Sequence, residues 1–217
     1  VELASYLNER ESIRLKKLNN EPRPWTTDPI LGKYKFTNVL REHDHTSQAF
    51  IKIYEQNRDA TKWQKFINAA VYRYFGTDTF ANHIGFIRNW DSDDLYNKAQ
   101  GLIDRGEKIF TSAYVITNGG ISAPKHEVVI YNYLRLLLTS PVMNRLIMEG
   151  EHKFQTLAEK MYTYAGFGGQ GFMTKEVLSD YALQVGAFED AYTWSPIGPG
   201  ALRGLAWIFP QFRVNTN

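Results

Sequence analysis

Apolar side chains recur every three to four residues along most of the chain, the spacing that places them on one face of a helix. The clearest case runs from 57 to 75, where the apolar positions are Trp63, Phe66, Ile67, Ala70, Val71 and Tyr74. Lys62, Lys65 and Arg73 fall between these positions. The pattern therefore predicts an amphipathic helix whose basic residues face the solvent.

Similar spacing predicts further helices. Ser92 and the acidic residues after it suit a helix start, and Pro124 suits a first turn. Residues 109–117 read instead as a strand that ends before an Asn-Gly-Gly turn. No repeat or long linker interrupts the chain, so we expect one mainly α domain over residues 1–217. The predicted helices cover 35–56 (one helix or two), 57–75, 92–105, a segment opening at 124, 140–149, 152–164, 171–185 and 200–209.

Composition narrows the function classes. The chain has 217 residues, 43% of them hydrophobic, which is enough for a sizeable core. It has no cysteine, which excludes disulfides, thiolate metal sites and cysteine nucleophiles, and we expect neither a metal nor a cofactor. No apolar run approaches the about 20 residues that span a bilayer, so we expect no membrane contact and a cytoplasmic protein. A net charge of +2 excludes a protein that coats nucleic acid but allows a local basic groove.

Two N-terminal segments carry polar residues that packing alone does not explain. Residues 24–31 place Trp25 and Asp28 in an extended loop between prolines. Trp25 suits either a core plug or a platform for a nucleobase, and Asp28 suits a local cap. In the next segment, after Phe36, Asn38 and Arg41 are three positions apart and are predicted to share a helical face, which is typical of a salt-bridged, solvated surface.

A glycine-rich stretch separates the predicted helices 152–164 and 171–185. Its glycines are Gly166, Gly168, Gly169 and Gly171. A turn of this kind lets backbone N–H groups reach a DNA phosphate in a helix–hairpin–helix motif, although it is often only a tight connection. It is not a P-loop, because no Gly-Lys-Ser/Thr follows. Further along, Gly198, Gly200 and Arg203 predict a second anion site at the start of the last helix.

Three carboxylates follow the glycine-rich stretch. Asp190 lies 22 residues after Gly168, close to the separation found in helix–hairpin–helix glycosylases. Such an aspartate stabilises a sugar cation or orients a nucleophile, and the alternative is that Asp190 only caps a turn. Glu176 and Asp180 are four positions apart on a predicted helix. Like charges at this spacing predict a raised pKa in one of them, a basic partner such as Lys175, or a solvated face.

Together these segments resemble the α-glutamyl/putrescinyl thymine pyrophosphorylase superfamily, which includes the helical domain of phage 5-hydroxymethyluracil DNA kinases. The resemblance spans roughly residues 6–207. It is carried by Pro24-Trp25-Thr26-Thr27-Asp28-Pro29-Ile30-Leu31, by Tyr34-Lys35-Phe36-Thr37-Asn38-Val39 with Arg41, Glu42 and Asp44, and by Gly198-Pro199-Gly200 with Arg203-Gly204-Leu205. It implies a fold similar to helix–hairpin–helix DNA glycosylases and DNA with 5-modified pyrimidines as the partner.

These observations lead to three hypotheses. The first is a DNA glycosylase, of the kind that serves in antiphage defence, that flips a modified pyrimidine out of DNA and cleaves its N-glycosidic bond, with Asp190 acting on the sugar. In that scheme Asp28, Asn38 and Arg41 line the base pocket, Trp25 or Phe36 stacks on the base, and the glycine hairpin grips the backbone. The second is an amino acid or polyamine transferase that acts on the base methylene, with Glu176 or Asp180 as the base. The third is a non-catalytic DNA-binding module.

Overall fold

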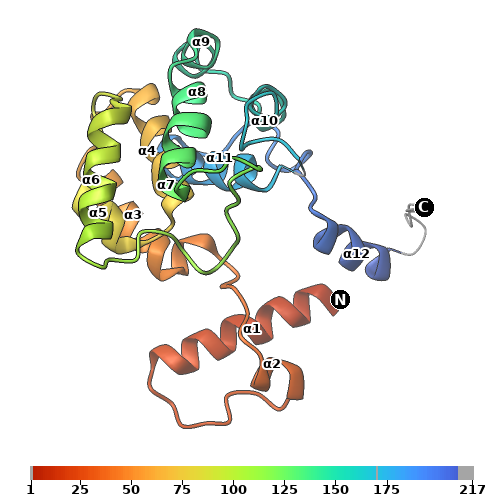
Figure 1. Ribbon diagram of the computed structural model, residues 1–217. Coiled ribbons are helices and arrows are strands. Elements are labelled where there is room, and N and C mark those ends of the chain that lie inside the picture. The colour runs from red at the N-terminus through yellow and green to blue at the C-terminus, as the bar shows by residue number, and fades with distance from the viewer. Residues whose placement is uncertain (1, 170, 210–217) are drawn as a thin grey trace.

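A computed structural model describes residues 2–169 and 171–209, and every regular element in these ranges is a helix. Figure 1 shows a helical body with α1 and α2 standing to one side of it and α12 to another. The predicted mainly α class is confirmed. In chain order the elements are α1 (Glu2–Leu18), α2 (Pro29–Lys33), the 3₁₀ turn η1 (Arg41–His43), α3 (His45–Glu55), α4 (Lys62–Phe75), α5 (Asp78–Ile84), α6 (Ser92–Asp104), α7 (Lys125–Glu127), the π-helical η2 (Val128–Leu134), α8 (Arg135–Leu138), α9 (Pro141–Glu149), α10 (Phe154–Met161), α11 (Phe172–Val185) and α12 (Pro199–Ile208).

Helix α4 is the central element of the body and packs against α11 and α9. Reciprocal capping between Thr61 and Gln64 defines its start. Residues 66–75 are all buried, which is typical of a helix enclosed on every side. The prediction that Arg73 lies on a solvated face is therefore wrong, because α11 covers that side of α4 and supplies Asp180 as its partner.

Residues 109–117, predicted as a strand, form an irregular segment. The N–H of Thr111 donates to the carbonyl of Phe75 at 2.8 Å, and the hydroxyl of Tyr114 donates to the carbonyl of Arg73. These two hydrogen bonds anchor the segment to the end of α4. A strand needs a partner strand for its backbone groups, and none exists within the described residues.

The N-terminal third also departs from the predicted helix over 35–56. Residues 35–40 are irregular and η1 begins only at Arg41, so Asn38 and Arg41 do not share a helical face. Asp44 ends this segment by accepting a hydrogen bond from the N–H of Ser47 at 3.0 Å, which starts α3. Helices α1, α2 and α5 were not predicted. The extended loop expected over 24–31 ends at Asp28, which caps the short helix α2 that begins at Pro29.

The glycine-rich stretch does connect two helices, α10 and α11, and its glycines pack against tyrosines. Gly166 has a φ of +83°, and a Cβ there would lie 2.5 Å from the Tyr133 ring and overlap the Tyr74 hydroxyl. That hydroxyl donates to the carbonyl of Gly166 at 2.5 Å. Gly168 and Gly171 are similarly close to Tyr162, whereas a Cβ on Gly169 would meet no atom within 4 Å. Gln170 lies outside the described residues, and a helix–hairpin–helix role for this turn stays a prediction.

We expect Gly166→Ala to destabilise the protein by about 2–4 kcal/mol, because a left-handed backbone strain adds to overpacking against two tyrosines. Gly169→Ala is the matched control, since it has the same sign of φ and open space, and should cost only about 1 kcal/mol. Urea unfolding followed by circular dichroism measures both values. Equal losses in the two variants would contradict the packing role of Gly166.

Candidate functional site

A cavity of about 550 Å³ lies where the loop before α3 meets the ends of α4 and α11. We call it the Arg41 cavity. Its wall is built from four separate segments of the chain, 37–47, 73–76, 111–114 and 172–176, which the fold brings together. The lining residues are Thr37, Asn38, Val39, Leu40, Arg41, Asp44, Thr46, Ser47, Arg73, Gly76, Thr111, Ala113, Tyr114, Phe172, Lys175 and Glu176.

Beneath the cavity lies a buried cluster of two arginines and two carboxylates. Arg73 grips Asp180 with two hydrogen bonds, from Nε to Oδ2 at 2.7 Å and from a terminal nitrogen to Oδ1 at 2.8 Å. Arg41 donates to the same Asp180 Oδ1 at 2.7 Å and to Glu176 Oε2 at 2.5 Å. Ser47 accepts a further bond from Arg73 at 3.3 Å. The Asp180 side chain is 1% exposed, so the two guanidinium groups compensate a fully buried carboxylate.

Glu176 is the carboxylate of this cluster that lines the cavity. Burial alone would raise the pKa of Glu176, but the charges of Arg41, Lys175 and Arg73 outweigh it and hold the pKa below its ordinary value. Lys175 lies 3.2 Å from its second oxygen and is 39% exposed. Of the outcomes predicted for the like-charged pair, basic partners are therefore confirmed, and a raised pKa at Glu176 and a solvated face are wrong.

The cluster determines what the cavity offers to a ligand. Both oxygens of Asp180 accept hydrogen bonds from arginine, so this carboxylate holds the guanidinium groups in place. A guanidinium has five N–H donors, and Arg41 gives two of them to the carboxylates. Its remaining donors, together with Asn38 and Thr111 in the wall, suit carbonyl or phosphate oxygens.

An aromatic pair forms another wall of the Arg41 cavity. The rings of Tyr114 and Phe172 lie 5.3 Å apart at 60°, and the Lys175 ammonium lies 5.6 Å from the Phe172 ring. Burial raises the pKa of Tyr114 to about 12, so its hydroxyl is protonated at neutral pH. Phe172 is 45% exposed and offers an apolar face at the opening of the cavity.

The structure brings together only part of the predicted base pocket. Asn38 and Arg41 line the Arg41 cavity, and Phe36 lies in a small neighbouring groove with Asn38. Trp25 lies outside both hollows, where its indole N–H donates to the carbonyl of Glu21 at 2.8 Å. Asp28 also lies outside them and caps α2 through the N–H groups of residues 30 and 31, which confirms the predicted local cap.

Asp190 also lies outside the lining of the Arg41 cavity. Its two oxygens accept hydrogen bonds from the N–H groups of Phe154 and Gln155, at 2.7 and 2.9 Å, so it caps the start of α10. Gly198 and Gly200 begin α12, and Arg203 is exposed on that helix, apart from the body in Figure 1. Catalysis by Asp190 and DNA binding by these residues stay predictions.

Sequence reasoning missed Arg73, Tyr114 and Phe172 as cavity residues. Arg73 lies between two tyrosines in the otherwise apolar stretch 69–75, and this is the one signal that could have marked it. An arginine inside such a helix needs a buried carboxylate partner. Tyr114 and Phe172 gave no local signal, because only the tertiary fold brings them together.

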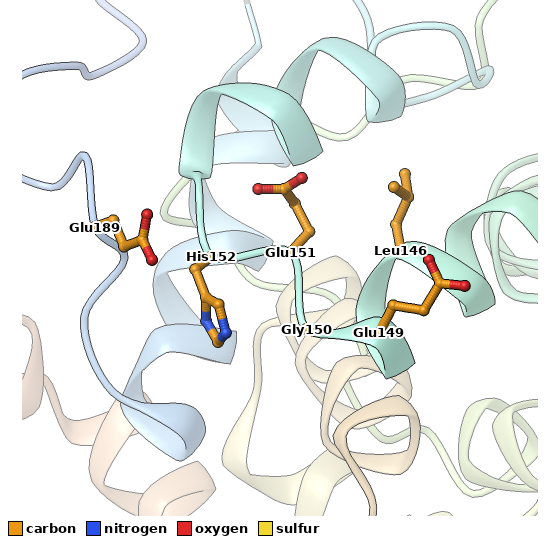
Figure 2. A pocket seen from close by; sticks show the side chains of 6 residues that line it. All are labelled: Leu146, Glu149, Gly150, Glu151, His152 and Glu189. Atoms are coloured by element: carbon orange, nitrogen blue, oxygen red, sulfur yellow. The ribbon is translucent and has the colours of Figure 1, made fainter.

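A separate acidic hollow of about 300 Å³ lies between α9 and α10. Figure 2 shows its side chains, with the carboxylates of Glu149, Glu151 and Glu189 spread around the rim and His152 pointing away from them. Within residues 2–169 and 171–209, no group of three or more histidine or carboxylate side chains is arranged to hold a metal ion. The hollow therefore offers no chelating geometry.

An all-helical domain with an arginine-lined, aromatic-walled cavity is suited to a planar polar ligand bearing oxygens. Residues 2–217 match the family model described as the helical domain of 5-hmdU DNA kinase, and the chain belongs to this family. This confirms the relationship inferred from its motifs. None of the described helices has the length and apolar character needed to cross a bilayer.

The chain is similar to a 5-hmdU DNA kinase of Bacillus phage SP10, with 24% identity over 228 residues. The match covers 94% of this chain and 35% of the phage protein, so the chain spans about a third of that curated relative. No solved structure matches the chain. The relative is named as a kinase, so the comparisons lend no support to the predicted glycosidic cleavage.

We expect Asp180→Asn to lower the free energy of unfolding by about 3–5 kcal/mol, because the buried Arg73 loses the carboxylate that accepts two of its hydrogen bonds. Asp59→Asn is the matched control, since Asp59 pairs with Arg88 at the surface at 3.4 Å and should cost about 0–1 kcal/mol. Chemical denaturation at neutral pH measures both. A loss of unfolding free energy in Asp180→Asn no larger than that in Asp59→Asn would contradict the structural role of the cluster.

We also expect Glu176 to stabilise the fold in a pH-dependent way. Because its folded pKa is below the ordinary 4.5, its contribution is fully present above that value and is lost as the pH falls through the folded pKa. The difference in free energy of unfolding between wild type and Glu176→Gln should therefore stay constant from neutral pH down to about pH 5 and shrink as the pH falls below about 4.5. The same comparison with the exposed Glu107→Gln serves as the control. A difference for Glu176 that does not change with pH would contradict the cluster's electrostatics.

Proposed function

We propose that this chain binds DNA carrying a 5-hydroxymethylated pyrimidine and that the Arg41 cavity receives the modified base for group transfer at its 5-substituent. The observation that carries the proposal is the cavity itself, which joins arginine donors to an aromatic wall. Enzymes that act on a base in DNA take it out of the stack into a pocket that reads its polar edge and stacks on its face. The similar phage protein is named for 5-hmdU in DNA, which supplies the substrate class.

The dimensions and chemistry of the cavity support this proposal. Its volume of about 550 Å³ lies within the about 300–1,000 Å³ that is usual for ligand pockets. Arg41 and Asn38 offer donors for the carbonyl oxygens of a pyrimidine, and Thr46 and Ser47 offer hydroxyls that can bind a hydroxymethyl group. Phe172 offers a face on which the base can stack.

Group transfer at the substituent fits these residues better than glycosidic cleavage does. Both oxygens of Asp190 cap α10, so the carboxylate proposed for the sugar already serves a structural role. A kinase, as the phage relative is named, transfers a group to a hydroxyl, and the hydroxymethyl substituent is the hydroxyl of this base. In this scheme the chain recognises and presents the base.

A second candidate function is that this chain itself assists the transfer through Glu176. Its Oε1 faces Lys175, and its lowered pKa keeps it ionised at neutral pH. An ionised carboxylate at the cavity wall can accept a proton from a hydroxyl or amine nucleophile. Asp180 is not suited to this role, because arginines occupy both of its oxygens.

We expect Phe172→Ala to weaken binding to an oligonucleotide with one 5-hydroxymethyluracil by about ten- to a hundred-fold, since it removes a stacking face. Phe172 is 45% exposed, so the fold should be retained. Fluorescence anisotropy against the same oligonucleotide with thymine measures both affinity and discrimination.

Tyr192→Ala is the matched control, because Tyr192 is 99% exposed and lines no part of the cavity. It should bind like the wild type. The proposal fails if the wild type binds both oligonucleotides equally, or if Phe172→Ala binds the modified strand as tightly as the control does.

A further inference from the structure

Residues 2–36 form a distinct arm beside the helical body. Figure 1 shows α1 and α2 packed side by side and joined to the body by a single extended segment. Ile13 of α1 and Leu31 of α2 are each 8% exposed, and both line one narrow groove on the arm. Lys16 donates to the carbonyl of Trp25 at 2.8 Å. This hydrogen bond ties the loop between the two helices to α1.

Positive charge is concentrated on this arm. Residues 2–36 carry seven basic and five acidic side chains, whereas the rest of the chain carries 18 of each, so the net charge of +2 lies on the arm. Arg14 is paired with Glu11 at 2.6 Å. Within the described residues, the other six basic side chains of the arm have no carboxylate within 4.0 Å; these are Arg10, Lys16, Lys17, Arg23, Lys33 and Lys35. A near-neutral protein therefore presents one locally basic face.

Aromatic rings alternate with these charges along a narrow groove. Arg10, Arg14 and Lys17 recur at helical spacing on the face of α1 that lines the groove, opposite Tyr34 and Phe36. The Arg10 guanidinium lies 5.0 Å from the Phe36 ring. Tyr34 is 58% exposed and Phe36 is 42% exposed, so both rings present apolar surface to the solvent. Exposed aromatic rings beside cations are the arrangement with which proteins bind unpaired nucleotides.

The groove is adjacent to the Arg41 cavity. Asn38 lines both hollows, and its side-chain amide donates to the carbonyl of His43 at 2.8 Å, which fixes the segment between them. Glu11 on α1 approaches His43 of η1 to 3.8 Å, so the arm also meets the segment that carries Arg41. A strand whose base enters the cavity would therefore have its neighbouring nucleotides at the arm.

We infer that the arm binds the DNA strand next to the modified nucleotide, with Arg10 and Lys17 on phosphates and Tyr34 and Phe36 stacked on unpaired bases. This inference rests on the proposed function, because the cavity defines where the strand enters. It adds a second site with a different task, since phosphate and stacking contacts give affinity for any sequence whereas the cavity discriminates between bases.

The test compares Arg10→Gln/Lys17→Gln with Arg145→Gln/Lys153→Gln, which removes the same charges from exposed positions on α9 and next to α10. Binding to single-stranded oligonucleotides, with 5-hydroxymethyluracil or with thymine, is measured by fluorescence anisotropy over a range of salt concentrations. The arm variant should bind both strands about tenfold more weakly, and the slope of log affinity against log salt should fall by about 1.4. The control should match the wild type.

Tyr34→Ala/Phe36→Ala provides an independent variant that leaves every charge in place. It should lose more affinity for single-stranded than for duplex DNA and keep the wild-type salt slope. Wild-type affinity and slope in both arm variants, with folding verified by circular dichroism, would overturn the inference. Failure of the proposed function looks different: the wild type would no longer discriminate between the bases, while the arm variants would still bind more weakly.

Discussion

The hydrogen-bonded pair of Arg73 and Asp180 is the contact on which the rest of the site depends. Removing two such charges from water costs several kcal/mol for each ion, and only close pairing offsets that cost. The pair therefore fixes how α11 lies against the central helix α4. Arg41 completes the same cluster from the far side, so the loop before α3 is held against both helices. The cavity exists because these three segments share one buried carboxylate.

The cluster also separates the roles of residues that look alike in the sequence. Glu176 and Asp180 are one helical turn apart, yet Asp180 is enclosed by guanidinium groups and Glu176 faces the cavity. Asp190, also a carboxylate of the same region, is bound to backbone N–H groups at the start of α10. The three carboxylates differ in their exposure and in whether both of their oxygens already accept hydrogen bonds, and residue spacing reveals neither property. Oε1 of Glu176 faces Lys175, which is partly exposed to solvent.

Much of the helical framework could be predicted from the chain, and most of the site could not. The periodic stripe at Trp63–Tyr74 and the local cap at Asp28 are short-range features, and short-range features are visible in a sequence. The irregular path of residues 109–117 depends on hydrogen bonds to the end of α4. The sequence of this segment resembles a strand, but no local pattern reveals those bonds. The partnership of Arg41 and Arg73 with Asp180 joins positions more than 100 residues apart. A single sequence gives no sign of such a distant contact, apart from the unusual arginine within the apolar stretch 69–75.

The regular geometry of α1 fixes the distance between two of the cations proposed to bind the strand. Arg10 and Lys17 are seven residues apart, which corresponds to about 10 Å along a helix axis. Successive nucleotides of one strand advance by about 3.4 Å in duplex DNA, so at that spacing about three nucleotides fit between the two cations. The arm would therefore contact phosphates at a fixed spacing and at fixed positions relative to the cavity. Oligonucleotides too short to reach the second cation would lose its contribution as a discrete step in affinity, rather than through a gradual decline.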